Sequence, residues 1–386
     1  MTKSQKVILG LLAALACALS LTVFYLAAQA YQLWTQRPLG PALDHPTPWQ
    51  LPATWTASPG APQPALTLVP SPKGAPTLSF STAIPASPFL PCTNLPTMTI
   101  LAIGSDARSD EYRYGRADMI RAVRVDFRAQ RITALEFPRD LWVKIPEIKD
   151  DLGTDHQKLN TAYTYGNPGL HFWDGTSQGP GLLARTLDQN FGLKADHYVA
   201  VNMNVFVDVV DALGGLDITL TEAIDGRTSS DRSERLVFPA GPQHLTGEQA
   251  LTLGRIRNVS VFSRASHQNL VLCALREEIE KPETILKIPA MISSFRDNIQ
   301  TDLTPEQISQ LACLGTTMPR SNILFASFPR ELFKPDNVFD PVLDQDVFIW
   351  NSDFDMLRDY VSQFNAGTWP ASSPFGTPEP GTNSCE

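Results

Sequence analysis

Two aspartates, spaced by twelve positions, have the pattern of a divalent-cation site. Asp106 belongs to the motif Gly104-Ser-Asp106-Ala-Arg108, and Asp118 closes the motif Arg116-Ala-Asp118 after a short polar loop. Magnesium is usually held by one or two carboxylates together with phosphate oxygens and waters. The pair therefore predicts a Mg²⁺ (or Mn²⁺) site beside a phosphate. The alternative, on spacing alone, is a turn residue at Asp106 and a surface charge at Asp118.

Several arginines are placed where they could bind the same phosphate. Arg139 is followed by Asp140, which can orient it, Arg255 and Arg257 are separated by one residue, and Arg264 follows on the next predicted helix. A guanidinium forks onto phosphate oxygens. Positive charge gathered in a protein of net charge -9 costs energy unless an anion offsets it. The arginines favour a phosphate or pyrophosphate ligand; a structural Arg–Asp pair and a solvated basic face are the alternatives.

Other polar residues could complete such a pocket. Lys158 and Asn160 stand where a loop enters a predicted helix, so they could reach the site or merely cap the helix. Arg264, His267 and Gln268 share one helix face because their spacing is i, i+3 and i+4. If His267 lines the pocket, bound pyrophosphate would favour the imidazolium and raise its pKa above the ordinary ~6.5.

The chain lacks the motifs of several common enzyme classes. It has no nucleophile elbow, no Walker phosphate loop, no His-Glu-x-x-His and no paired catalytic cysteine. Acyl hydrolysis and nucleotide-driven chemistry therefore lose most of their support. The acidic net charge, without a basic stripe, argues against binding to a nucleic-acid backbone.

The elements that must position these residues predict an α/β fold. A strand over residues 97–103 would deliver Asp106 at its end, where ligands gather in α/β sheets. Thr246 and Thr304 each begin a capping box that opens a helix. Strands alternating with helices predict a mixed central sheet with helices on both faces. The other expected elements are a hairpin of 119–127 with 131–137, helices over 182–191 and 205–213, and a strand over 216–220.

A long uncharged segment near the N-terminus predicts a membrane anchor. Residues 7–31 carry no charge, and about 20 apolar residues suffice to cross a bilayer. Lys3 and Lys6 precede the segment, so the positive-inside rule keeps residues 1–6 as a cytoplasmic stub and places the rest outside the cell membrane. A cleaved signal peptide, whose apolar region is usually shorter, is the alternative.

Proline-rich composition marks the segments on either side of the folded part. Fifteen of the 32 prolines lie between Pro38 and Pro96, so residues 32–96 predict an extended extracytoplasmic linker. Residues 367–386 repeat this composition and predict a disordered tail. The α/β domain is therefore expected over residues 97–366.

Four cysteines follow the predicted anchor, at positions 92, 273, 313 and 385. Four cysteines allow three pairings, and an exported setting permits disulfides. None of them has the close spacing of a zinc site. Cys273 and Cys313 both fall in predicted helices, so we expect these two to be paired.

A set of short motifs occurs in an order typical of a known family. Over about residues 97–279 the chain resembles the LytR-CpsA-Psr (LCP) family of cell-wall glycopolymer phosphotransferases. The motifs after the two that hold Asp106 and Asp118 are Pro138-Arg-Asp140, Lys158-Leu-Asn160-Thr-Ala-Tyr163, Val210-Asp-Ala-Leu-Gly-Gly215, Phe238-Pro-Ala-Gly241, Leu245-Thr-Gly-Glu-Gln-Ala-Leu251 and Arg255-Ile-Arg257.

The resemblance implies a membrane-anchored extracytoplasmic enzyme of cell-wall assembly. Such a transferase moves a glycopolymer from a polyprenyl-pyrophosphate carrier onto peptidoglycan, and an apolar cavity, here expected between helices 182–191 and 205–213, holds the prenyl tail. By the same resemblance, Asp106 and Asp118 would hold Mg²⁺. The resemblance further implies catalytic roles for Arg116, Arg139, Arg255 and Arg257, and substrate binding by Arg108, Lys158, Asn160, Arg264, His267 and Gln268.

Four positions depart from the family pattern. Ala117 and Met119 stand on either side of Asp118, where the family usually has Ser and Thr. Where the family commonly reads Asp-x-x-Arg-x-x-Arg-Gln, this chain has Val261 in place of the aspartate and His267 in place of the second arginine. The positions expected to bind metal and phosphate persist, which favours an enzyme. A non-catalytic protein that binds polyprenyl phosphate or wall glycan is the alternative of a different class.

Overall fold

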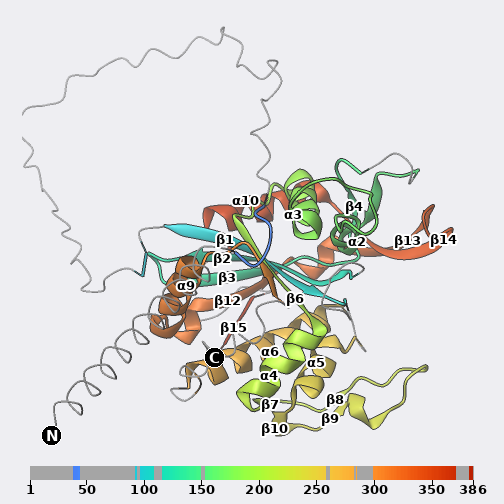
Figure 1. Cartoon of the computed structure of the whole chain (residues 1–386). Coiled ribbons are helices and arrows are strands. Elements are labelled where there is room, and N and C mark those ends of the chain that lie inside the picture. The colour runs from blue at the N-terminus through green and yellow to red at the C-terminus, as the bar shows by residue number, and fades with distance from the viewer. Residues whose placement is uncertain are drawn as a thin grey trace, which may run out of the picture. The chain divides into compact units, whose positions relative to one another are not determined.

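The first predicted strand lies inside a mixed β-sheet. The computed structural model describes residues 38–43, 92–93, 96–107, 115–148, 153–257, 261–281, 284, 299–370 and 382–385. Within this part, seven strands are ordered β11-β6-β1-β2-β3-β12-β15 (Figure 1). The bounds are β1 Thr97–Ser105, β2 Ala117–Asp126, β3 Arg131–Glu136, β6 His197–Asn202, β11 Ile299–Thr301, β12 Ile323–Ser327 and β15 Thr382–Ser384.

Strand pairing confirms the mixed character of the sheet. β1 is antiparallel to β2 and parallel to β6, and β3 is antiparallel to β2 and parallel to β12. The expected hairpin is thus formed by β2 and β3. The two outer strands, β11 and β15, run antiparallel to their neighbours.

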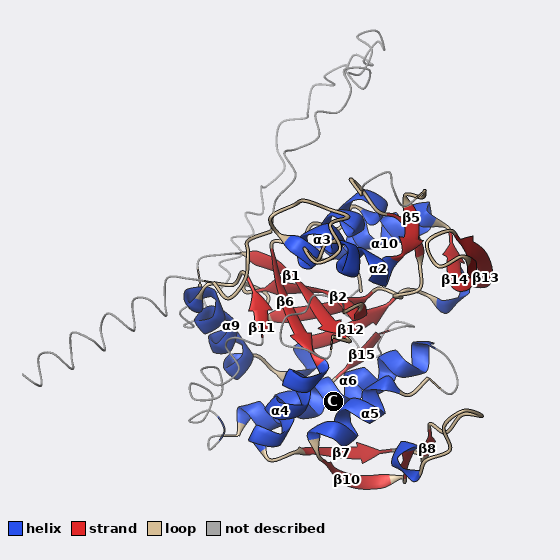
Figure 2. Ribbon diagram, turned by 45° about the vertical axis from the view of Figure 1, so that its right-hand side comes forward, coloured by secondary structure: helices blue, strands red, loops and turns tan. Residues whose placement is uncertain are grey.

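Alternation along β1 separates the two faces of the sheet. Leu101 and Ile103 belong to a core that includes residues of α2 (Leu159–Tyr165), α3 (Gln178–Phe191) and α10 (Phe354–Ala366). Figure 2 shows these three helices on one side of the sheet and α4 (Met203–Leu213), α5 (Gly247–Arg255) and α6 (Val261–Glu280) on the other. Met98 and Ile100, on the second face, pack with residues of α9 (Pro305–Thr317). The prediction of helices on both faces is therefore confirmed.

Local sequence signals account for the helix boundaries. Thr246 and Thr304 form the expected capping boxes with Gln249 and Gln307. Such a box satisfies two backbone N–H groups that a helix start would otherwise leave unpaired. At the start of α4, the side chain of Asn202 accepts a hydrogen bond from the backbone of Val205.

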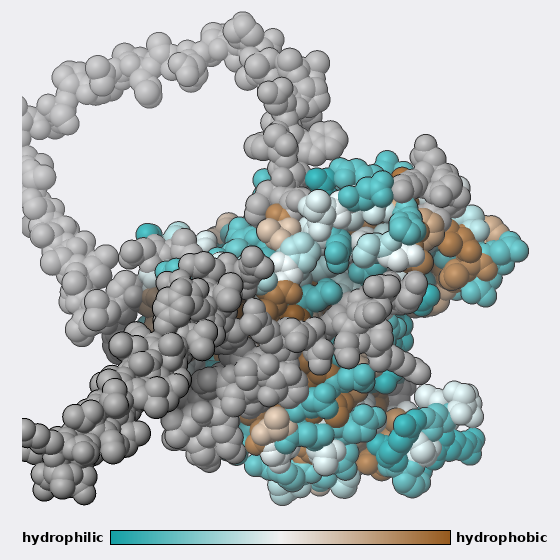
Figure 3. Space-filling view, viewed as in Figure 1, coloured by the Kyte–Doolittle hydropathy of each residue, from teal (hydrophilic) through white to brown (hydrophobic). Residues whose placement is uncertain are grey.

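Short strand pairs extend from the sheet. One pair, β13 (Phe333–Asp340) with β14 (Gln345–Ser352), carries exposed apolar side chains that form a hydrophobic patch in Figure 3: Phe339, Val342, Leu343 and Phe348. The side-chain amide of Gln157 donates a hydrogen bond of 2.7 Å to Asp340 and so holds this hairpin to β5. The remaining pairs are β4 (Trp142–Lys144) with β5 (His156–Lys158), β7 (Leu216–Leu220) with β10 (Gly241–Leu245), and β8 (Ile224–Asp225) with β9 (Val237–Phe238).

The flanking segments pack on the domain at the points where they are described. The predicted anchor, residues 7–31, lies outside the described residues, and none of the described helices is both long and apolar enough to cross a bilayer. Leu43, in the expected linker, is buried in the core, and its backbone donates to Asp302. In the tail expected to be disordered, Trp369 is buried and residues 382–384 form β15.

The disulfide prediction was wrong. Cys92 pairs with Cys313 of α9, and Cys273 of α6 pairs with Cys385. Both helix cysteines form disulfides as expected. Their partners, however, are Cys92, which precedes β1, and Cys385, which follows β15. Proline-rich composition concealed that the segments holding these two partners return to the domain.

Candidate active site

A β-bulge turns Asp118 toward a cavity on the α4–α5–α6 side of the sheet. Gly104 of β1 pairs with Met119 of β2, whereas Ser105 pairs with Ala117, so Asp118 is the extra residue. In a regular strand, Asp118 and Met119 would point to opposite faces, but a bulge re-aims one side chain. Both line the same cavity. The sequence predicted the strand but not the bulge that gives this aspartate its direction.

Asp106 is fixed opposite Arg116 at the same end of the sheet. The Asp106 N–H donates to the Arg116 carbonyl at 3.0 Å, and Oδ1 of Asp106 accepts from the Arg116 N–H at 2.6 Å. These two hydrogen bonds hold Asp106 against Arg116, and Arg116 precedes Asp118 by two positions in the chain. The Arg116 side chain is exposed and does not line the cavity. Arg108 lies outside the described residues.

Arg139 is held between two carboxylates. It donates from Nη1 to Asp118, and from Nε to Asp140 at 3.2 Å; Nζ of Lys158 lies 3.4 Å from the other oxygen of Asp140. Burial opposes the charge on Arg139, but Asp118 and Asp140 outweigh it and raise the pKa. The backbone of Asn160 donates to the Arg139 carbonyl at 3.1 Å. Arg139 is therefore charged and fixed in direction.

Three more arginines converge on this position. Nη2 of Arg257 lies 3.7 Å from Asp118, Arg264 is buried on α6, and Arg255 lines the same cavity from the end of α5. Burial lowers the pKa of both Arg257 and Arg264, and the charge of Arg139 lowers them further. An anion bound here would relieve this repulsion.

An apolar cavity of about 360 Å³ opens beside the arginines. Its polar lining includes Asp118, Arg257, Arg264 and Gln268. The α3 helix, which was expected to line a prenyl cavity, packs on the opposite face of the sheet and does not contribute. The apolar lining comes mainly from β6, α4, α5 and α6, and includes Val199, Val201, Val205, Phe206, Val209, Leu251, Val271, Leu272 and Leu275.

A buried arginine behind the site was missed by sequence reasoning. Arg121 of β2 is fully enclosed and donates to the side chains of Asn269, at 2.6 Å, and Gln268, at 3.3 Å. Gln268 in turn donates to the Gly254 carbonyl at 3.3 Å. Glu136, opposite Arg121 in the β2–β3 register, has a pKa raised by burial. The signal in the sequence was an arginine, Arg121, at an inward-facing position of a predicted strand, with Glu136 on the neighbouring strand of the predicted hairpin.

The remaining predicted residues lie around the site in different ways. Lys158 contacts Asp140, the carboxylate that holds Arg139, and so reaches Arg139 only indirectly. Asn160 is buried at the start of α2 and does not line the cavity. His267 is half-buried and is not among the lining residues; burial lowers its pKa. This direction is opposite to the one expected for a histidine facing pyrophosphate.

Comparison with known sequences identifies relatives. A family model described as the LytR_cpsA_psr family matches residues 82–347. The polyisoprenyl-teichoic acid–peptidoglycan teichoic acid transferase TagV of Bacillus subtilis is 27% identical over 53% of this chain and 49% of its own. TagU of Oceanobacillus iheyensis, described by the same activity, is 28% identical over 55% and 61%. The regulatory protein MsrR of Staphylococcus aureus is 26% identical over 57% and 61%. The chain thus matches about half to three fifths of each relative's length.

Solved structures share the fold. The crystal structure of B. subtilis TagV aligns with a TM-score of 0.52 and 21% identity, over 71% of this chain and 98% of its own. The structure of TagT bound to LIIa-WTA aligns with a TM-score of 0.51 and 20% identity, over 73% and 95%. At these identities the likeness establishes the fold alone.

Proposed function

The chain belongs to the LytR_cpsA_psr family, and from that premise we propose that it transfers a glycopolymer from a polyprenyl-pyrophosphate carrier to peptidoglycan. TagV and TagU, described as transferases of polyisoprenyl-linked teichoic acid to peptidoglycan, support the reaction class. The observation that carries the proposal is the largely apolar cavity that Arg255, Arg257 and Arg264 also line. A substrate with a hydrocarbon tail and a pyrophosphate head has the matching polarity.

Each half of the substrate has a counterpart in the site. The prenyl chain would enter between α4, α5 and α6, where its burial removes apolar surface from water. The pyrophosphate would lie between Arg139 and Arg257, whose guanidinium groups flank Asp118. Arginine binds phosphate oxygens in a bidentate manner. The cavity is at the small end of the range for ligand pockets, ~300–1,000 Å³, so it would hold only part of a long tail.

The proposed reaction is a phosphoryl transfer. A hydroxyl oxygen of the acceptor forms a bond to the phosphorus that carries the glycopolymer, the P–O–P bond breaks, and polyprenyl phosphate leaves as the hydroxyl proton is lost to solvent. Charge develops on the phosphate oxygens and on the leaving group. Arg139, Arg257 and Arg264 would stabilise this charge, and Asp140 would hold Arg139 in place.

Asp106 and Asp118 are the residues that would hold Mg²⁺ or Mn²⁺. Their carboxylates are hard oxygen donors at one end of the sheet, and this pair fits an ion that takes one or two carboxylates with phosphate oxygens and waters. Within the described residues, no group of three or more His, Cys, Asp or Glu side chains could hold a metal ion. The bound ion would neutralise part of the pyrophosphate charge.

The proposed location is the outer side of the cell membrane, with residues 7–31 as the anchor. Two disulfides support an oxidising compartment. Protease added to intact cells should then remove the domain beyond Arg37. A domain that stays fully protected while a known surface protein is cleaved would refute this location.

The decisive experiment is transfer of a labelled glycan from prenyl pyrophosphate to peptidoglycan with Mg²⁺ present. We expect wild-type turnover that chelator abolishes, and loss of turnover with unchanged folding in Asp106→Ala and Asp118→Ala. Full activity of the double aspartate variant in chelator would refute the metal role. Binding of the lipid without turnover, in wild type and in the Val261→Asp/His267→Arg variant alike, would show a binding protein in place of an enzyme.

A further inference from the structure

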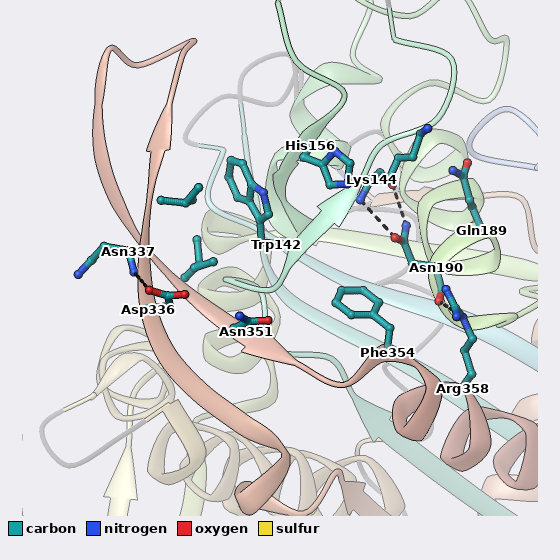
Figure 4. Close-up of a pocket in the computed structure, with 12 residues that line it drawn as sticks. Trp142, Lys144, His156, Gln189, Asn190, Asp336, Asn337, Asn351, Phe354 and Arg358 are labelled. Atoms are coloured by element: carbon teal, nitrogen blue, oxygen red, sulfur yellow. Dashed lines mark hydrogen bonds between the residues drawn. The ribbon is translucent and has the colours of Figure 1, made fainter.

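A second pocket, of about 600 Å³, lies on the α3–α10 side of the molecule and is not used by the proposed site (Figure 4). It is an open pocket bordered by β4 and β5 on one side and by the β13–β14 hairpin on another, and α3 and α10 form the rest of its wall. Trp142 lies between the hairpin and His156, and Phe354 lies near Asn190 and Arg358 (Figure 4). Its size falls within the usual range of ligand pockets.

The lining combines aromatic rings with unused amides. Strand register puts Asp336 opposite Ile349, and Asn351 follows Ile349 by two positions, so these side chains share the face toward the pocket. Among the residues that the structure describes, the side-chain amides of Gln189 and Asn351 have no hydrogen-bond partner. Each amide offers a carbonyl acceptor and two N–H donors.

The rigid part of the pocket is built separately from these groups. Asn190 uses its amide to join the backbone of Lys144, accepting at 3.2 Å and donating at 2.7 Å. Arg358 donates to the Asn190 carbonyl at 2.8 Å, and the ring of Phe354 stacks on Phe191 at 5.3 Å. Asn190, Arg358 and Phe354 are therefore held by contacts within the protein, whereas the amides of Gln189 and Asn351 are available to a ligand.

The pocket carries little net charge, unlike the arginine site. Lys144 and His156 both contact Asp155, at 3.0 and 2.6 Å, and Arg358 contacts Asp355 at 2.7 Å. The two lining cations, Lys144 and Arg358, are thus each partnered by a carboxylate, so a polyanion gains little here. A neutral ligand with hydroxyl and amide groups is favoured instead.

A pyranose ring is such a ligand. Its C–H face is apolar and stacks on the negative face of an indole, while its hydroxyl and acetamido groups need donors and acceptors at the rim. We propose that this pocket binds a neutral N-acetylated sugar chain, the acceptor glycan, with Trp142 as the stacking platform and Asn351 and Gln189 as hydrogen-bonding groups. The acceptor role rests on the proposed function; sugar binding itself does not.

The pocket is connected to the arginine site through one short ribbon. Trp142 pairs with Lys158 across β4 and β5, so their side chains share a face. Nζ of Lys158 lies 3.4 Å from Asp140, which contacts Arg139 at 3.2 Å. A sugar chain bound on Trp142 would thus be linked through Lys158 and Asp140 to Arg139, which the proposed function assigns to the pyrophosphate. This arrangement suits an acceptor.

The test measures binding of a β-1,4-linked N-acetylglucosamine tetramer to the full chain in detergent by ligand-observed NMR. We expect Trp142→Ala and Asn351→Ala each to weaken binding about tenfold. Asn351 is exposed, so its variant remains informative if Trp142→Ala fails to fold. Phe339→Ala, an exposed aromatic on the same hairpin but outside the pocket, should bind normally. Unchanged binding in both pocket variants would overturn the proposal, as would tighter, Trp142-dependent binding of soluble polyglycerol phosphate.

Transfer kinetics separate this inference from the proposed function. If both hold, Trp142→Ala raises the KM for the glycan acceptor about tenfold with little change in kcat. Trp142-dependent sugar binding in a protein that never transfers would refute the proposed function and keep the sugar site. Normal transfer with an unchanged acceptor KM in Trp142→Ala and Asn351→Ala would refute the acceptor site and keep the function.

Discussion

Nη1 of Arg121 donates a 2.6 Å hydrogen bond to Oδ1 of Asn269, and this bond ties the middle of the sheet to α6. The same guanidinium donates to Gln268, one of the residues that line the apolar cavity. Burial lowers the pKa of Arg121, and the carboxylate of Glu136 opposes that shift. The buried Arg121, through its hydrogen bonds to Asn269 and Gln268, therefore supports the wall from which Arg264 and Gln268 project.

Loss of Arg121 alone should destabilise the fold strongly. Arg121→Met removes the donor to Asn269 and Gln268, and the loss of such a buried hydrogen-bonding group typically costs about 1–3 kcal/mol of unfolding free energy. The double variant Arg121→Met/Glu136→Gln should recover only the part of that loss that comes from the uncompensated charge of Glu136. Chemical denaturation of all three proteins checks the expectation.

Arg128→Met is the matched control, because Arg128 is exposed on the turn between β2 and β3. Arg128→Met should change the free energy of unfolding by less than about 0.5 kcal/mol. Equal stability of Arg121→Met and wild type would show that Arg121 contributes nothing to holding α6.

The parts of the fold set by local pattern were predictable. Thr246 and Thr304 marked their helices because capping depends on neighbouring residues alone. The β2–β3 hairpin followed from two apolar runs and a short turn. Lys158, expected in a loop, is instead the last residue of β5, because β4 pairs with it.

Features that depend on distant contacts were not predictable. The bulge at Asp118 shows only when two strands are paired, and the partner of Arg121 is more than a hundred positions away. The same holds for the disulfide between Cys92 and Cys313, which are 221 positions apart. The arginine and aspartate residues led to the prediction of phosphate chemistry, but the directions of their side chains come from tertiary structure.

His267 should make the protein less stable in acid. Burial lowers its pKa, so the folded state favours the neutral ring. Above its ordinary value of 6.5 both states are neutral and His267 contributes no pH dependence. Below 6.5 the unfolded chain binds the proton first, so stability falls with pH until the folded pKa is reached. His267→Gln should show a smaller loss of Tm between about pH 7.5 and 5.5.

His244 provides a control of opposite sign. The hydrogen bond that this exposed ring donates to the Asp217 carboxylate raises its pKa, so its stabilisation is present at low pH and is lost as pH rises. His244→Gln should therefore lose a small stabilisation in acid. If His267→Gln followed the pH profile of wild type, the neutral state of the buried ring would be contradicted.

The bridge between Cys273 and Cys385 should stabilise both α6 and the edge strand β15. It joins positions 112 apart, and removal of a native disulfide typically costs about 2–5 kcal/mol. Cys273→Ser/Cys385→Ser should unfold at a lower temperature than wild type. A reductant should lower the Tm of the variant further through the Cys92–Cys313 bridge. Thermal scans with and without reductant measure both steps; identical Tm values under all conditions would argue against these pairings.

Arg139→Lys should abolish most of the proposed transfer although it keeps the charge. Arg139 contacts Asp118 through Nη1 and Asp140 through Nε, and a lysine presents one point charge that cannot reproduce both contacts. An arginine that stabilises a transferring phosphoryl group is worth about 10³–10⁵ in rate, so a loss of at least about a thousandfold in kcat is expected. Arg227→Lys is the control, because Arg227 makes a similar forked contact to Asp225 on the exposed surface, outside the cavity lining. It should leave the rate unchanged. Wild-type kcat in Arg139→Lys would mean that charge alone suffices at this position, and that the fixed direction given by Asp118 and Asp140 has no part in the reaction.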